Sequence, residues 1–246
     1  MQGDSRVQRK LQALAAGLVD LIFPPACVYC RRLGSHFCRP CQETAQFLGD
    51  AICVRCGIPA AVRCTCAACR PLPPGPLCGM RGAVRYQGPV RFAIHAFKYR
   101  GMTDLAAPLA GYLVAYLEAY PLAVDCLVPV PLHAERLAFR GYNQSELLAK
   151  AVSKARGLPV RTDLIARTRH TQPQVQLKAR QRRTNMHEAF APLQAGCLRG
   201  ETVLLIDDVG TTGSTLNACA VALQEAGAGD IWALTVARAY YDLHSS

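Results

Sequence analysis

Short apolar runs alternate with longer amphipathic stretches through the last two thirds of the chain. The short runs predict strands, at 83–86, 126–130, 202–206 and 231–236. The longer stretches repeat apolar side chains at the rhythm of one helical face, and they predict helices at 90–99, 105–120, 143–156 and 215–225. Because β/α units of this kind build parallel sheets, the pattern indicates an α/β fold, Rossmann-like and doubly wound, with a mainly parallel sheet.

The first 23 residues are predicted to form an amphipathic helix. Its apolar stripe consists of Leu11, Leu14, Leu18 and Leu21. The stretch is too short to cross a bilayer, and residues 20–25 supply no clean signal-peptide cleavage site. We therefore expect a cytoplasmic protein with no transmembrane segment, whose N-terminal helix packs on the rest of the chain.

Composition divides the chain into a small and a large part. The chain has 246 residues, of which 51% are hydrophobic, so intrinsic disorder is excluded. Ten of the 13 cysteines lie between Cys27 and Cys78, and a proline-rich stretch at 71–76 closes this region. We predict a helix at 1–23, a Cys-rich module at 24–79 and an α/β domain at 80–246. The net charge of +11 favours phosphates, nucleotides or nucleic acid as partners.

Eight of these cysteines form four C-x2-C pairs. The pairs make two sets of four thiolates: Cys27, Cys30, Cys38 and Cys41, then Cys53, Cys56, Cys66 and Cys69. In a reducing cytoplasm such a pattern indicates metal rather than disulfides. Four thiolates complete the tetrahedral shell of zinc and leave no open position, so we predict two structural zinc ions in a double zinc ribbon. One zinc ion, or a redox-active or iron-sulfur assembly, are the alternatives.

Three details of this module stay open. Cys64 competes with Cys66 as a ligand, Cys78 has no evident partner, and His36 could replace a thiolate. The spacing fits consecutive sites and cross-braced sites equally well.

The stretch 202–215 combines an apolar strand, two acids and a hydroxyl-rich turn that opens a helix. The turn comprises Thr211, Thr212, Gly213, Ser214 and Thr215. Backbone N–H groups and hydroxyls at a helix N-terminus suit a phosphate, while Asp207 and Asp208 suit neighbouring sugar hydroxyls or Mg2+. Together they predict a site for a ribose 5-phosphate at the carboxyl end of a strand.

This stretch resembles the phosphoribosyl pyrophosphate (PRPP) motif of type I phosphoribosyltransferases. The resemblance implies that Asp207 and Asp208 hold the ribose hydroxyls and that residues 211–215 hold the 5-phosphate, with Mg2+ accompanying PRPP. Gly210 stands where the family usually has a bulky apolar residue. We therefore expect a more flexible loop and a lower ligand affinity.

The other motifs narrow the resemblance to the ComF family. The cysteine module is followed by FKYRG at 97–101, VPVPLH at 128–133 and RGYNQSE at 140–146, and then by the PRPP motif. In this order they resemble ComF proteins over about residues 20–238, a family that includes ComFC-type competence proteins and a GntX-type protein linked to gluconate use. The resemblance implies a cytoplasmic protein of natural transformation that acts with a competence helicase on incoming single-stranded DNA.

A loop after the second strand is predicted to face the pyrophosphate of PRPP. It comprises Val130, Pro131, Leu132 and His133. A cis peptide bond before Pro131 costs only about 0.5–1 kcal/mol, so we expect one there. His133, Lys98, Arg100 and Arg140 are candidate contacts for phosphate oxygens.

A strongly basic segment runs from Arg161 to Arg183, with seven basic residues and one acid. It occupies the position of the mobile loop that closes over the substrate in phosphoribosyltransferases, and Arg180 and Arg183 are candidate contacts there. We favour a lid over a DNA track, because stacking on single-stranded DNA needs aromatic side chains and none occurs in this segment.

Two classes of function follow from these motifs. The first is a PRPP-binding phosphoribosyltransferase-like protein of natural competence, and the second is a non-catalytic PRPP sensor or adaptor. An active phosphoribosyltransferase in nucleotide or gluconate-related metabolism is a further alternative. The residues predict neither a general acid or base, nor an accepting base, nor an oligomeric state.

Overall fold

The computed structural model describes residues 24–168 and 189–240. The predicted N-terminal helix and most of the basic segment, including Arg180 and Arg183, lie outside these ranges. No helix within them combines the length and apolar character that a bilayer crossing requires.

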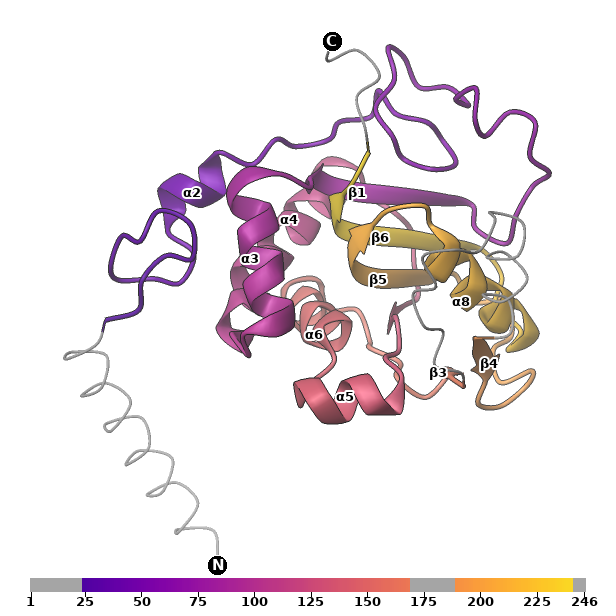
Figure 1. Ribbon diagram of the computed structural model, residues 1–246. Helices are drawn as coiled ribbons and strands as arrows, with labels where there is room; N and C mark the ends of the chain where they lie inside the picture. The colour runs from indigo at the N-terminus through magenta and orange to yellow at the C-terminus, as the bar shows by residue number, and fades with distance from the viewer. Residues whose placement is uncertain (1–23, 169–188, 241–246) are drawn as a thin grey trace, which may run out of the picture.

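A four-stranded parallel sheet forms the centre of the molecule (Figure 1), in the order β1-β6-β5-β2. The strands are β1 (Gly79–Arg85), β2 (Cys126–Pro129), β5 (Val203–Gly210) and β6 (Ile231–Arg238). All four predicted strands and the parallel sheet are thus confirmed. Strand β5 continues beyond its predicted end, because it stays paired with β6 as far as Gly210 and Arg238.

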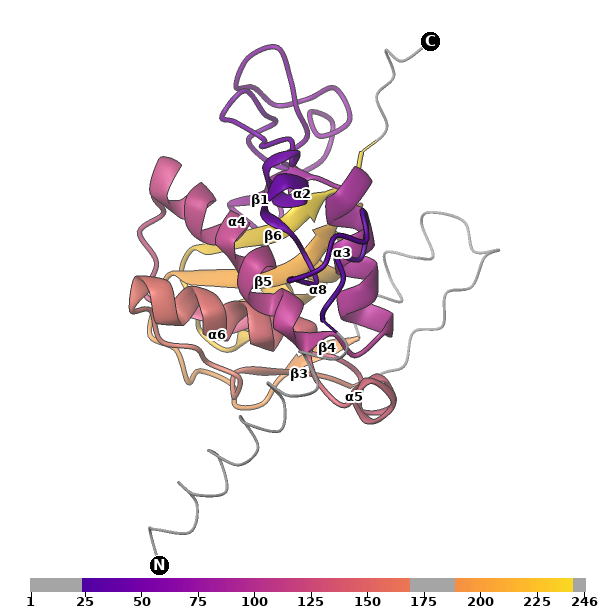
Figure 2. The ribbon, with the colours of Figure 1, turned by 90° about the vertical axis from the view of Figure 1, so that its left-hand side faces the viewer.

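Helices cover both faces of the sheet (Figure 2). One face carries α3 (Gly88–Tyr99), α4 (Ala106–Ala119) after the short η1 (Thr103–Leu105), and α6 (Gln144–Arg156). The other carries α8 (Ser214–Glu225) and a small antiparallel pair, β3 (Ile165–Arg167) with β4 (Phe190–Pro192). Alternate residues of β5 supply the two cores: Leu204 and Ile206 enter the first, Val203 and Leu205 the second.

The four helices predicted after residue 80 are confirmed, and two short α-helices within the described residues were missed. These are α2 (Arg39–Glu43) and α5 (Ala134–Arg140), which are too short to show a helical period. Local capping marks the ends that were predicted well: Asn143 accepts a hydrogen bond from the Ser145 N–H at the start of α6, and Gly157 ends it in the left-handed region at φ +73°.

The cysteine-rich region packs against the sheet and its helices. Val28 and Phe37 are buried in the same core as α3 and α4. Phe47 bridges to Val84 in β1, and the Met80 N–H donates to the Arg55 carbonyl at 2.8 Å. The module therefore shares its core with the α/β domain, although the pattern along the chain separates them.

Candidate functional site

Two clusters of four thiols lie one after the other along the chain. They consist of Cys27, Cys30, Cys38 and Cys41, and of Cys53, Cys56, Cys66 and Cys69, with all sulfurs of a cluster within 4.8 Å of one another. The Sγ atoms of Cys30 and Cys38 lie 3.5 Å apart, and those of Cys56 and Cys66 lie 3.8 Å apart. In a tetrahedron with Zn–S bonds of about 2.3 Å the sulfurs are about 3.8 Å apart, so both clusters fit structural zinc.

The tertiary structure settles the details that the spacing left open. The two sites are consecutive, and Cys66 rather than Cys64 belongs to the second cluster. The His36 ring instead pairs with the Asp104 carboxylate. Cys78 lies against Asp230, with Sγ 3.4 Å from Oδ1, and burial followed by this acid raises the pKa of the thiol.

The two acids of the predicted ribose site lie at the carboxyl end of β5. Asp208 is 2% exposed; its Oδ1 lies 2.7 Å from the Lys98 Nζ, and its buried Oδ2 has no hydrogen-bond partner among the described residues. Asp207 is half-buried, and its Oδ1 accepts from the Ser145 Oγ at 2.8 Å and from the Asp208 N–H at 2.9 Å. A buried carboxylate oxygen without a donor is unusual and indicates a missing partner at this site.

Burial and mutual repulsion shift the protonation of this group. Burial, with the neighbouring Asp208 charge, raises the pKa of Asp207 to about 7, although Lys98 and Ser145 oppose the shift. Burial lowers the pKa of Lys98, but the charges of Asp208 and Asp207 outweigh it, so this pKa lies above its usual value. The site thus holds one charged lysine against two acids, with negative charge to spare for a cation.

Three backbone donors in the turn after β5 have no acceptor among the described residues. Gly213 is the N-cap of α8 and adopts the left-handed φ of +78°, and no side chain caps the helix. The N–H groups of Thr211, Thr212 and Gly213 donate to no other described residue. The hydroxyls of Thr212 and Ser214 lie 2.8 Å apart beside them, and Thr215 follows in the first turn of α8. Free N–H groups at an uncapped helix start form a nest for an anion.

Gly210 is more closely packed against its neighbours than a glycine in a flexible loop would be. It is the last residue of β5, and a Cβ placed on it would lie 3.2 Å from both the Met80 Sδ and the Thr235 Oγ1. The sequence therefore predicted a looser position than the packing shows. A bulky side chain is absent because Met80 already fills that space.

The predicted pyrophosphate loop lies beside the acids. The Val130 N–H donates to the Ile206 carbonyl at 3.0 Å, one residue before Asp207, and the Asn143 side chain donates to the Val130 carbonyl at 3.1 Å. The cis bond expected before Pro131 is absent, because the described peptide bonds are all trans. His133 begins α5, where its Nδ1 accepts from the Glu135 N–H at 3.4 Å.

The candidate basic residues have different surroundings. Lys98 pairs with Asp208, as described above. Arg140 bonds to Gln144 and stacks on the Tyr99 ring, with its Cζ 5.5 Å from the ring centre. Arg100 is exposed just beyond α3. Only Lys98 of these three contacts an acid of the site in the described structure.

Three residues at the site were missed by sequence reasoning. Ser145 and Asn143 belong to the RGYNQSE motif, whose order along the chain was noted but whose roles were not. Arg238 lies at the end of β6 and donates to the carbonyls of Gly210 and Thr211. No local signal marks Arg238, because the two turn carbonyls that it binds are distant in sequence.

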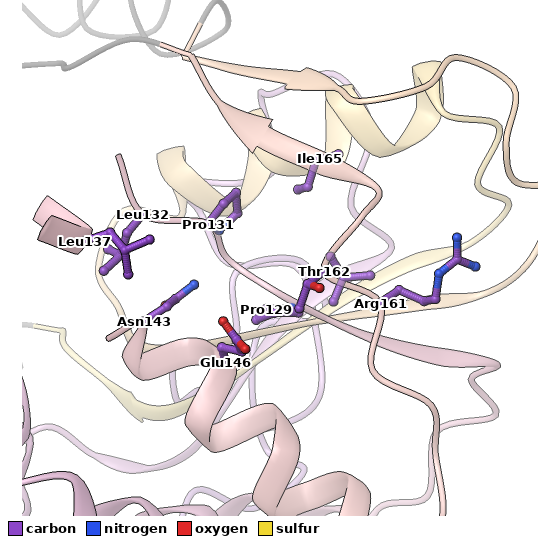
Figure 3. Close-up of a pocket in the computed structure, with 10 residues that line it drawn as sticks. Pro129, Pro131, Leu132, Leu137, Asn143, Glu146, Arg161, Thr162 and Ile165 are labelled. Carbon is purple, nitrogen blue, oxygen red and sulfur yellow. The ribbon is translucent and has the colours of Figure 1, made fainter. Parts of the chain in front are cut away.

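A separate cavity of about 160 Å3 is lined in part by the pyrophosphate loop (Figure 3). Pro131 and Leu132 of the loop, Asn143 and Glu146 at the start of α6, and Thr162 contribute to its walls. The acids of β5 and the turn at 211–215 do not line it.

The protein combines a parallel α/β sheet, which carries two acids and an anion nest at the end of one strand, with two four-cysteine sites. This combination defines a phosphoribosyltransferase-type domain with a double zinc ribbon. Matches to family models agree: "Double zinc ribbon domain" covers residues 18–70 and "Phosphoribosyl transferase domain" covers residues 143–240.

Curated relatives identify the family. The chain is 32% identical over 229 residues to "DNA utilization protein YhgH" of Escherichia coli O157:H7, covering 87% of this chain and 98% of the relative. It is 34% identical over 160 residues to "Competence protein F" of Haemophilus influenzae, covering 63% and 70%. The chain belongs to the ComF family. Among solved structures, an adenine phosphoribosyltransferase matches with 16% identity and a TM-score of 0.35, covering 60% of this chain and 75% of that one.

Proposed function

We propose that this protein binds PRPP at the carboxyl end of β5. Asp207 and Asp208 accept hydrogen bonds from the ribose hydroxyls, and residues 211–215 hold the 5-phosphate. The observation that carries the proposal is that a buried carboxylate oxygen lies next to three backbone N–H groups, and that none of these groups has a hydrogen-bond partner within residues 24–168 and 189–240. An acceptor site for a diol directly beside an anion nest matches the two ends of a ribose 5-phosphate.

Magnesium fits the same site. Carboxylate oxygens are the ligands that Mg2+ prefers, and the two acids exceed the charge of Lys98. Bound there with the ligand, Mg2+ would neutralise pyrophosphate oxygens, while Val130 to His133 line the side of the site where we place the pyrophosphate. The Lys98 ammonium, 2.7 Å from the Asp208 Oδ1, holds that side chain in place before the ligand arrives.

Titration calorimetry of the whole protein with Mg2+ and PRPP tests the proposal. We expect saturable binding of one PRPP per chain. Pyrophosphate release in the presence of candidate bases then separates the two classes of function: release assigns a transferase, and binding without release assigns a sensor or adaptor. Absence of binding would refute the PRPP site.

Affinity for PRPP is expected to rise with pH. With a pKa of about 7, the ionised fraction of Asp207 increases from about 0.1 at pH 6 to about 0.9 at pH 8. Because the ionised form is the stronger acceptor, affinity should increase about tenfold over this range. The same titration with Asp207→Asn shows how much of the slope belongs to the ligand's own ionisation. An equal slope in that variant would contradict the role of Asp207.

We further propose that the protein binds single-stranded DNA in natural competence. Relatives carry names that refer to competence and to DNA utilisation, and one surface of this chain favours such a ligand. Helix α3 exposes Phe92, His95 and Tyr99 along one face. Tyr29, which lies between two cysteines of the first thiol cluster, contacts Phe92 with ring centres 5.3 Å apart. Aromatic rings that are half exposed provide stacking surfaces for unpaired bases.

Basic side chains accompany this aromatic stripe. Arg91 and Arg100 are exposed on and just beyond α3, and Arg140 stacks on Tyr99. The aromatics that the basic segment lacks are thus supplied by another element. The proposal includes the cytoplasm as compartment, because the cysteine clusters need reduced thiols, and a competence helicase as partner, which follows from the family alone.

Removing rings from the stripe should weaken DNA binding. Each stacked base contributes about 1–3 kcal/mol, so we expect Phe92→Ala/Tyr99→Ala to raise the Kd for a fluorescent oligo-dT by at least about tenfold in anisotropy measurements at fixed salt. Phe47→Ala is the matched control, since Phe47 is 53% exposed and Phe92 is 51% exposed. Equal affinity of the two variants would exclude the stripe as the DNA surface.

A further inference from the structure

The second zinc knuckle, the segment 53–69 that carries the second thiol cluster, lies directly against β1. The Met80 N–H donates to the Arg55 carbonyl at 2.8 Å, and a Cβ on Gly57 would come within 2.3 Å of the Met80 carbonyl oxygen. The backbone of the knuckle is therefore in direct contact with the backbone of β1. The Met80 side chain extends to the turn at 211–215, called the phosphate turn below. Its Cε and Sδ lie 3.3 and 3.5 Å from the position that a Cβ on Gly213 would take.

A single buried guanidinium joins the same knuckle to the phosphate turn. Arg238 is 4% exposed. Its Nε donates to the carbonyl of Cys56, a residue of the second thiol cluster, at 3.0 Å. Its Nη1 donates to the Gly210 carbonyl at 2.8 Å and to the Thr211 carbonyl. One rigid, planar group thus holds the backbones of both sites at once.

These bonds decide where the free donors of the turn point. In a trans peptide the C=O of one residue and the N–H of the next point in opposite directions. Since Arg238 holds the carbonyls of Gly210 and Thr211 on its own side, the N–H groups of Thr211 and Thr212 are turned away from it. They are two of the three free donors of the anion nest.

Charge balance links this arrangement to the metal. A zinc ion with four thiolates carries a net charge of about −2, and two buried arginines, Arg81 and Arg238, contact the second knuckle through the carbonyls of Val54 and Cys56. A buried guanidinium is costly without a compensating charge. The loaded site supplies that charge, so it favours the position of Arg238 that holds the turn.

We propose that Arg238 is a positioning residue through which the second zinc site preorganises the phosphate turn for its anion. The inference rests on the proposed PRPP site, and it names a contact that controls the affinity of this site for PRPP. The zinc ion remains structural and does not contact PRPP, and its loss would weaken PRPP binding at the neighbouring turn.

Conservative replacement of each buried arginine tests the link. Arg238→Lys keeps the charge, but one ammonium cannot reach Cys56 and both carbonyls of the turn together. We expect zinc content close to wild type, a Tm lowered about as much as in the Arg81 control, and a PRPP Kd raised about tenfold. Arg81→Lys is the matched control, because Arg81 is about equally buried on the same knuckle and, among the described hydrogen bonds, its guanidinium donates to the carbonyls of Val54 and Met80 and to none of the turn. Equal losses in both variants would overturn the proposal.

A readout without PRPP keeps this inference separate from the proposed function. The amide NMR signals of Thr211 to Gly213 in the full-length protein should shift in Arg238→Lys and in Cys66→Ser, which removes one zinc ligand of the second site. They should stay in place in Arg81→Lys and in Cys64→Ser. If wild type does not bind PRPP but these shifts occur, the proposed function fails and the link stands. Unchanged amide signals in Arg238→Lys would refute the link whatever the affinity.

Discussion

The double variant Asp207→Asn/Asp208→Asn is expected to lose PRPP affinity by at least about a hundredfold. Each carboxylate is placed against a ribose hydroxyl or the accompanying Mg2+, and hydrogen bonds to a charged group contribute about 1.5–3 kcal/mol each. Two such losses amount to about 3–6 kcal/mol, which corresponds to a Kd raised by a factor of roughly one hundred or more. Calorimetry at pH 8, where Asp207 of the wild type is ionised, measures the effect.

Stability separates loss of the ligand from loss of the fold. The pKa of Asp207 is raised from 3.8 to about 7 in the folded protein, so the folded state favours the protonated acid. That stabilisation is present below pH 4 and is lost as the pH rises through 7. At pH 8, Asp207→Asn alone should therefore have a Tm at or above that of wild type while its PRPP affinity falls. A lower Tm with unchanged affinity would place Asp207 in the fold instead of the site.

A surface carboxylate provides the control for both acids. Asp163 is exposed and pairs with Arg161 through bonds of 2.8 and 2.9 Å. Asp163→Asn should bind PRPP as wild type does. If the double variant at 207 and 208 also binds as wild type does, the assignment of the ribose site is wrong.

Removal of zinc is expected to have the largest effect on stability. A structural zinc site contributes on the order of 10 kcal/mol, which is comparable to the whole stability of a typical domain. Because Val28 and Phe37 of the cysteine module belong to the main core, the loss should not stay local. We expect chelation to lower Tm by more than about 10 °C and to release two zinc ions per chain, measured by differential scanning fluorimetry and a colorimetric zinc assay.

Two neighbouring cysteines provide a sharp control for this result. Cys66 belongs to the second thiol cluster and Cys64 does not, although they are two residues apart. Cys66→Ser should retain one zinc ion per chain and melt at a lower temperature, whereas Cys64→Ser should retain two. Equal zinc contents in the two variants would contradict the ligand set.

The elements of the fold were predicted well where the pattern is long and local. The helix at 143–156 and the strand at 231–236 were found because apolar periodicity and caps act within one segment. The short helix α5 and the pair β3 with β4 were missed, because three to seven residues show no period. The eight cysteines of the two thiol clusters were predicted because C-x2-C spacing is itself local geometry.

The segment of the proposed site was found from the sequence, but the residues that contact it from other elements were not. Asp207, Asp208 and the turn at 211–215 are contiguous, so one segment carries them. Lys98, a candidate phosphate contact, lies against Asp208, while Ser145 and Arg238 were not expected at the site at all. These contacts join residues 28 to 110 positions apart, and no pattern along the chain reports such distances.

The sequence by itself determined the class of sheet, the two sets of thiolates and the segment that carries the proposed ribose and phosphate site, because each depends on residues close together in the chain. Only the tertiary structure decided that the zinc sites are consecutive, that Lys98 balances Asp208, and that Arg238 joins the second knuckle to the phosphate turn. Packing brings those groups together through strand order and burial, and the energies of burial are properties of the whole fold.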